Sequence, residues 1–167
     1  MLSSYIDQPV MPRAEVTREC SAGGDRPILR QQRLRPLSVA PGSSGSEATW
    51  VTRICFDALR TSHAGEPCLV VDQREVRGPT STTLCGNALL AAGRSPGYYA
   101  LIFPAADRKA LIAALPNLGR TEALASDLDA GLATGDVTLI EYLDSVSALS
   151  RHPGTPIARY AQLRLSG

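Results

Sequence analysis

Cys68-Leu69-Val70-Val71 is a continuous apolar run that stops at Asp72. An apolar run without alternation is typical of a strand that is buried on both faces, as in a parallel sheet. A second such run spans 98–103, and a third strand is predicted over 137–140. We expect these three strands to be neighbours in one sheet, and the predicted fold depends on that arrangement.

Apolar residues at helical spacing occupy the stretches before and between these strands. The clearest repeat begins at Trp50, after Ser44-Gly45-Ser46-Glu47, which fits the capping box that starts a helix. The same reasoning predicts helices over 46–64, 80–92, 105–115 and 120–134, with Asp144 capping a last helix through Leu149. Residues 159–165 are expected either to form a further strand or to be an irregular C-terminal end.

The order of these elements predicts an α/β fold, with a small, mainly parallel sheet and crossover helices. The beginning of the chain is different, because Pro and Gly residues interrupt it and it contains no apolar residues at helical spacing. Residues 1–25 are predicted to form an irregular, loosely ordered N-terminal arm, and 26–167 a single α/β domain. The segment 33–39 is predicted to be an edge strand, because Pro36 cannot donate to a central ladder.

The composition excludes several classes of protein. The chain has 167 residues and a formal net charge of +1, so no overall field attracts it to nucleic acid or to an acidic membrane. From its first residues we expect no secretory signal, and no stretch approaches the roughly 20 apolar residues in a row that a membrane-spanning helix needs.

Cysteine and histidine usage points to no metal and no cofactor. The four cysteines show no C-x-x-C spacing, and we expect all of them to be reduced, three in the core, in a cytoplasmic protein. The two histidines lack the spacing of a zinc site.

The candidate site residues follow the first buried strand, because ligands of open α/β sheets gather beyond the carboxyl ends of the strands. They are Asp72, Arg74, Thr80, Ser81, Thr82 and Thr83. The hydroxyl residues follow a Gly-Pro turn and open a predicted helix, whose free N–H groups favour an anion. The simpler interpretation is that one hydroxyl caps the helix. Asp72 is interpreted first as an acceptor for loop amides, and second as a metal ligand or a charge that faces a partner.

No catalytic residue is predicted. The chain contains no P-loop, no dinucleotide fingerprint and no nucleophile elbow. The spacing leaves open a Cys–His pair such as Cys85 with His63, but Cys85 lies on a predicted apolar face. Asp127 and Asp129 are interpreted as the solvated side of the helix over 120–134.

Three features of residues 68–150 resemble a STAS-type domain, in particular its anti-anti-sigma-like and lipid-binding-like members. A buried strand ends in Asp72-Gln73-Arg74, a hydroxyl-rich turn opens a helix at Thr80, and the strand over 137–140 leads through Asp144 into a short helix. The resemblance implies a small sheet with helices on one face, and a role in binding partner proteins rather than in catalysis. In phosphorylatable members a partner kinase modifies a hydroxyl at the start of that helix, which matches Thr80 to Thr83 here. The Asp-Ser-Ser-Gly run of the family is missing.

The sequence therefore favours a non-catalytic regulatory or scaffolding module that binds a partner protein through the surface from Asp72 to Thr83. The alternative is a small enzyme, or a binder of an anionic small molecule, at the carboxyl ends of the strands. A third possibility is that residues 1–45 fold on a partner and use the domain as an anchor. A protein partner is expected, without nucleic acid and without a membrane span.

Overall fold

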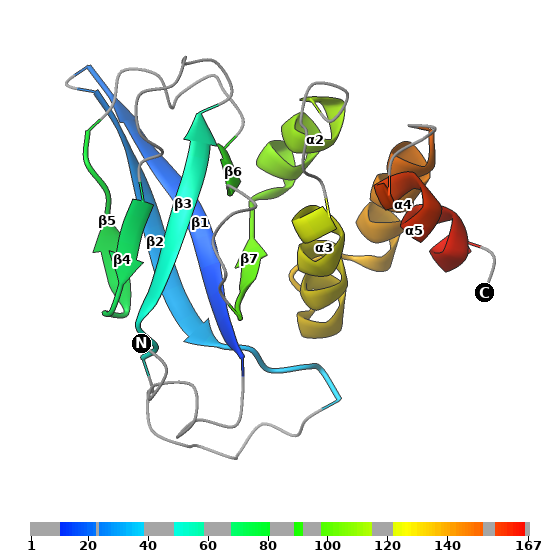
Figure 1. The fold of residues 1–167 in the computed structure, drawn as a ribbon, viewed down its shortest axis with the longest axis horizontal. Helices are drawn as coiled ribbons and strands as arrows, with labels where there is room; N and C mark the ends of the chain where they lie inside the picture. The colour runs from blue at the N-terminus through cyan, green and yellow to red at the C-terminus, as the bar shows by residue number, and fades with distance from the viewer. Residues whose placement is uncertain are drawn as a thin grey trace.

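One of the two longest strands, β1, lies where the sequence predicts a loosely ordered arm. In this computed structural model, β1 (Pro12–Ser21) and β2 (Gly24–Arg33) make an antiparallel hairpin in which Val16 lies opposite Leu29 (Figure 1). Gly24 has a φ of 118°, which suits glycine in the hairpin turn. The structure describes residues 11–22, 24–38, 49–58, 68–80, 89–91, 98–114, 122–151 and 156–165.

The prediction of a loosely ordered arm is wrong for residues 12–21, while residues 1–10 lie outside the described part. Every second residue from Pro12 to Val16 is buried, so Ala14 and Val16 face the core while their neighbours do not. This period of two is the strand signal that the count of Pro and Gly obscured. Pro27 is accommodated in β2, where its carbonyl accepts a hydrogen bond from Gly78 N (2.8 Å).

Two small sheets contain all the described strands. The first has the order β5-β2-β1-β7, with β5 (Glu75–Arg77) antiparallel to β2 and β7 (Ala100–Ile102) parallel to β1. The second has the order β4-β3-β6 and is antiparallel, with β4 (Cys68–Val71), β3 (Thr52–Ala58) and β6 (Leu89–Ala91). A mixed α and β composition is confirmed, but the expected mainly parallel sheet is wrong for the described strands. A turn rather than a helix joins β1 to β2, and this makes them an antiparallel pair. A turn also joins β4 to β5, but these two strands belong to different sheets.

The expected helix over 46–64 is wrong at its centre, which forms β3. Thr52, Ile54 and Phe56 are buried and Arg53 is exposed, so the segment alternates as a strand does. Trp50 and Ile54 are four residues apart, and this spacing fits a helical face and one face of a strand equally well. The rest of the range, 46–48 and 59–64, lies outside the described residues.

The apolar runs that opened the sequence analysis are strands, with one difference. Cys68–Val71 is β4 and the run over 98–103 contains β7, as expected. The two are not neighbours, because β4 pairs with β3 and β7 pairs with β1. Leu69 and Val71 are buried but Val70 is 49% exposed, so β4 is buried on one face only.

Two helices match their prediction and two elements near the C-terminus do not. The helices α2 (Ala105–Ala114) and α3 (Glu122–Thr134) lie where they are expected. The predicted strand over 137–140 is wrong, because Thr138 is the N-cap of α4 (Leu139–Ser150), and the start expected at Asp144 is too late. Residues 159–165 belong to α5 (Pro156–Leu165), neither a strand nor a trailing end.

Two further expectations are partly outside the described residues. Residues 89–91 form β6, so the helix predicted over 80–92 does not reach its expected end, and 81–88 are not described. The edge strand predicted over 33–39 is limited to Arg33, since Leu37 and Ser38 form a turn.

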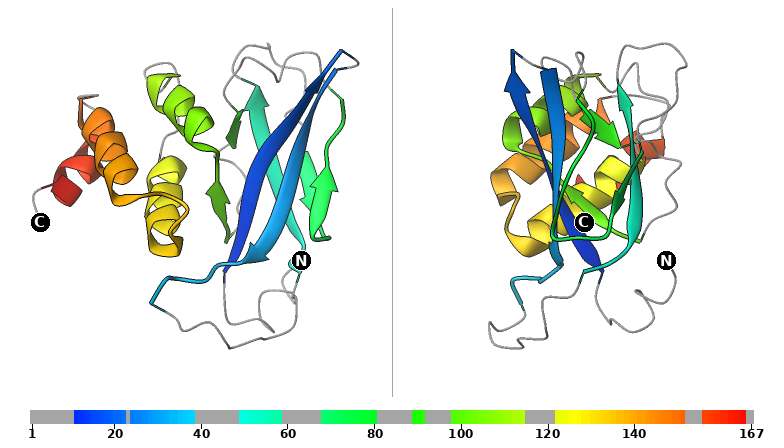
Figure 2. Two further views of the ribbon diagram at one scale, coloured as in Figure 1. Left: turned by 180° about the vertical axis from the view of Figure 1, so that it is seen from behind. Right: turned by 90° about the vertical axis from the view of Figure 1, so that its left-hand side faces the viewer.

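The core joins both sheets to the helices. The right-hand view of Figure 2 shows β1 and β2 on one side of the strand layer and β3 on the other, with the helices behind the strands. The core contains Val16 and Leu29 from the first sheet, Phe56 from the second, and Leu111 and Leu128 from the helices. No helix in the described part of the chain is long and apolar enough to cross a bilayer.

Candidate functional site

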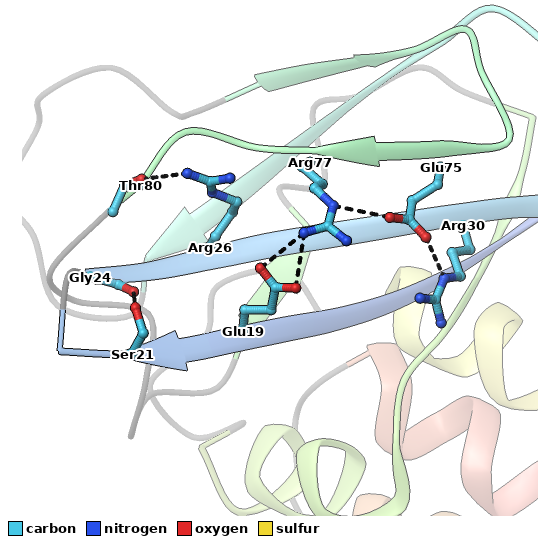
Figure 3. A network of polar contacts seen from close by, with 8 residues as sticks. All are labelled: Glu19, Ser21, Gly24, Arg26, Arg30, Glu75, Arg77 and Thr80. Carbon is cyan, nitrogen blue, oxygen red and sulfur yellow. Dashed lines mark hydrogen bonds and ion pairs between the residues drawn. The ribbon is translucent and has the colours of Figure 1, made fainter.

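The structure separates the residues that the sequence predicts as one site. Asp72 and Arg74 lie in the exposed turn between β4 and β5. Thr80 lies past the other end of β5, where its hydroxyl accepts a hydrogen bond from Arg26 Nη2 (3.1 Å) (Figure 3). Ser81, Thr82 and Thr83 are outside the described residues. Asp72 and Thr80 therefore do not converge, and the shared rim beyond three parallel strands does not exist.

The outer face of the first sheet is covered by charged side chains that bind one another (Figure 3). Glu75 accepts hydrogen bonds from Arg30 Nε (2.8 Å) and Arg77 Nε (3.1 Å), and Arg77 Nη1 also contacts Glu19 (3.0 Å). These bonds, first that from Arg30 and then that from Arg77, lower the pKa of Glu75, and Glu75 raises the pKa of Arg30. We refer to these four residues, Glu19, Arg30, Glu75 and Arg77, as the outer-face ion pairs. Two arginines are neutralised by two glutamates, so this face has little unpaired charge that could bind a ligand.

A groove of about 700 Å³ lies between α2 and α4. Its apolar lining consists of one isoleucine and four alanines: Ile112, Ala105, Ala106, Ala113 and Ala148. Short side chains on both helices leave this space open. The volume falls within the range of about 300–1,000 Å³ that is usual for binding sites of small ligands.

Arg108 is buried at the side of this groove. Its exposed fraction is 7%, and its guanidinium donates to the carbonyl of Phe103 and, through Nη2, to Glu141 Oε1 (3.2 Å). Glu141 in turn accepts a hydrogen bond from Thr138 N (3.0 Å), completing the capping box of α4. The bonds from Thr138, and then the charge of Arg108, lower the pKa of Glu141. The charge of Arg108 is thus matched by Glu141 within the fold.

The remaining charges of the groove are Lys109, Asp144 and Arg151, which gives it an excess of one positive charge. Lys109 on α2 and Arg151 at the C-cap of α4 are both exposed where they line the groove. Ser145 donates its hydroxyl hydrogen to the carbonyl of Glu141 (2.6 Å), so this hydroxyl is occupied by the backbone. The groove is therefore suited to hold an apolar group beside an anion.

Asp127 is a buried carboxylate that the sequence analysis assigned to the solvated side of its helix, and this assignment is wrong. It accepts a hydrogen bond from Leu101 N (2.8 Å), and so satisfies an N–H group of β7 on the side away from β1. Burial raises the pKa of Asp127 to about 7. The hydrogen bond from Leu101 has the opposite, smaller effect and lowers this pKa. Asp127 lies three residues after Leu124, on the buried face of α3, and that spacing is the signal that could have identified it.

Neither the geometry nor the comparisons identify a metal site or a family. Within the described residues, no group of three or more histidine, cysteine or acidic side chains is placed to hold a metal ion. No protein-family model matches the chain, and no curated protein matches it. The chemistry of the groove between α2 and α4 is therefore the basis for a functional proposal.

Proposed function

We propose that the protein is a non-catalytic regulatory or scaffolding module that binds a segment of a partner protein in the groove between α2 and α4. The observation that carries the proposal is the combination of an alanine-rich lining with two exposed cations, Lys109 on α2 and Arg151 at the C-cap of α4. A helical segment that lays an apolar face into a groove between helices is a common mode of peptide recognition. Small side chains on the receiving helices let the backbone of such a segment come close.

The charges indicate what the segment carries. Lys109 on α2 and Arg151 at the end of α4 exceed Asp144 by one charge, since Arg108 and Glu141 are paired. Carboxylates on the partner would be attracted to these two cations. We therefore expect an amphipathic segment with small apolar residues on one face and acidic residues at its edges.

The surface from Asp72 to Thr83, which the sequence predicts as the partner site, stays a prediction with less support than the groove. Its described residues lie at opposite ends of β5, and a partner would have to span that strand to contact them all. The resemblance to STAS-type domains also stays a prediction. Cys68–Val71 forms the strand that the resemblance expects, whereas Leu139 begins a helix where a strand is expected.

A second candidate is binding of an anionic small molecule in the same groove. The volume of about 700 Å³ and the exposed cations Lys109 and Arg151 favour it. The two candidates differ in the size of the occupant, so an experiment with the full chain can separate them.

The experiment is photo-crosslinking of the full chain in its own cells, with a photoreactive amino acid at Ala113 or at Ala148. The control is Ala110, which is exposed on α2 but does not line the groove. We expect protein adducts from the two groove positions and none from Ala110. In the double variant Lys109→Glu and Arg151→Glu, the adduct yield should fall about tenfold, since each reversed charge costs roughly 0.5–1 kcal/mol.

The opposite result has a clear meaning. Equal adduct yields from Ala110 and Ala113 would contradict binding in the groove. If no adduct forms, but citrate or inorganic phosphate raises the melting temperature of the wild type and not of the double variant, the small-molecule function replaces the proposed one.

A further inference from the structure

The described cysteines are all oxidised, contrary to the expectation of reduced thiols. A disulfide joins Cys55 of β3 to Cys68 of β4, and Cys20, near the end of β1, is disulfide-bonded as well. Cys85 lies outside the described residues. Within the described part of the chain, no cysteine is free.

The pairing of β3 with β4 brings the thiols of Cys55 and Cys68 together. These two residues are opposite each other in the antiparallel register, next to the pair Ile54 and Leu69. Ile54 and Leu69 point into the core, so the hydrophobic core sets this register. Directly opposed side chains of an antiparallel pair lie on the same face of the sheet, and here the two sulfurs are bonded to each other.

Three cysteines were expected in the core, but of the described ones only Cys55 is buried. Ile54 and Phe56 belong to the main hydrophobic cluster and Cys55 does not, because it lies on the other face of β3. Cys68 is half-buried and Cys20 is exposed. Packing as small buried hydrophobes therefore does not account for Cys20 and Cys68.

We propose that this protein folds and works in an oxidising compartment, with its cysteines as permanent disulfide staples, rather than in the cytoplasm. Disulfides persist in extracellular and periplasmic environments, whereas the cytosol keeps thiols reduced. Each disulfide forms when two thiols lose two electrons and two protons. A disulfide of an oxidising partner takes up the electrons and protons and leaves as two thiols. The inference does not depend on the groove, because it concerns the strand layer.

The test is thiol trapping in the cells that make the protein. Cells are quenched in acid, free thiols are labelled with a maleimide, and the full chain is then reduced and labelled with a second maleimide of different mass. Peptide mapping should find only the second label on Cys20, Cys55 and Cys68. The first label on Cys55 and Cys68 in most molecules would overturn the proposal.

A second measurement concerns the purified chain. Adding a reductant to the oxidised wild type should lower its melting temperature by about 10 °C for the Cys55–Cys68 bond, which closes a short loop in the unfolded chain. The variant Cys55→Ser with Cys68→Ser should start at the lower melting temperature. If that variant does not fold, the trapping result alone decides. A wild type whose melting temperature is insensitive to reductant would show that the bond is no staple, and would contradict the proposal.

Discussion

Two charged regions of this molecule contain the same residue types but differ in their exposure to water. In the outer-face ion pairs, the side chains of Arg77 and Glu19 are 48% and 50% exposed. Among the helices, the side chain of Arg108 is 9% exposed and Asp127 is buried against β7. Exposed ion pairs contribute little to stability because water screens them, whereas a buried charge that loses its partner is costly. The outer face should therefore tolerate substitution, and the helices should not.

The largest effect should come from Arg108→Ala. The substitution leaves the carbonyl of Phe103 and one oxygen of Glu141 without their donor, so we expect a loss of about 3 kcal/mol in the free energy of unfolding. Urea denaturation measures it. The matched variant on the outer face is Arg30→Ala, which should change the melting temperature by no more than about 2 °C. If Arg108→Ala and Arg30→Ala lowered the free energy of unfolding equally, the two regions would not differ in their contribution to stability.

The next effect concerns pH and Asp127→Asn. Since the pKa of Asp127 is raised to about 7 by folding, the wild type loses stability as the pH rises from about 4 through 7. The Asn variant keeps an oxygen for Leu101 N and carries no charge. The full pKa shift corresponds to about 4 kcal/mol, and the partial exposure of the residue to water reduces this. The variant should therefore be more stable than the wild type by about 2 kcal/mol at pH 8 and equal to it at pH 4. Thermal denaturation across this range measures the difference.

Glu75→Gln is the control on the outer face, with the opposite sign. The pKa of Glu75 is lowered, so its contribution is present above its unfolded pKa and disappears as the pH falls through its folded value. The variant should be slightly less stable than the wild type at pH 7 and equal to it at low pH. If Asp127→Asn and Glu75→Gln followed the same trend, the assignment of one carboxylate as buried and the other as exposed would be wrong.

Apart from the outer-face controls, the smallest effect should come from Thr138→Ala at the start of α4. The hydroxyl of Thr138 accepts a hydrogen bond from Glu141 N (3.2 Å), and its loss should cost about 1 kcal/mol. Thr138→Ser keeps the hydroxyl and should retain most of the stability. A Ser variant as unstable as the Ala variant would mean that the methyl group of Thr138, and not the cap, is responsible.

The sequence located α2 and α3 but missed β1, β2 and β3, for a physical reason. In α2 and α3, the local pattern of apolar residues is sufficient, because every backbone hydrogen bond of a helix is made within about four residues. The strands β1 and β2 contain Pro and Gly, and their stability depends on partners across the hairpin and on β7. Local composition therefore predicted an irregular arm where the sheet has one of its two longest strands, β1.

The candidate site was less predictable than the fold. Asp72, Arg74 and Thr80 were grouped because a parallel sheet would have brought strand ends to one edge. Once β4 pairs with β3 and not with β7, that edge does not exist. No sequence motif indicates the groove between α2 and α4. Lys109 and Arg151 are far apart in the chain, and only the packing of the helices brings both to the same groove.

By itself, the sequence determined the mixed α and β composition, the positions of α2 and α3, and the strands that contain Leu69 and Leu101. Only the tertiary structure decided that Ile54 belongs to a strand, that Asp127 is buried and that Cys55 meets Cys68. The reason is that a period of apolar residues is a local property. Strand register, burial of a charge and pairing of thiols each depend on which distant segment the core brings alongside.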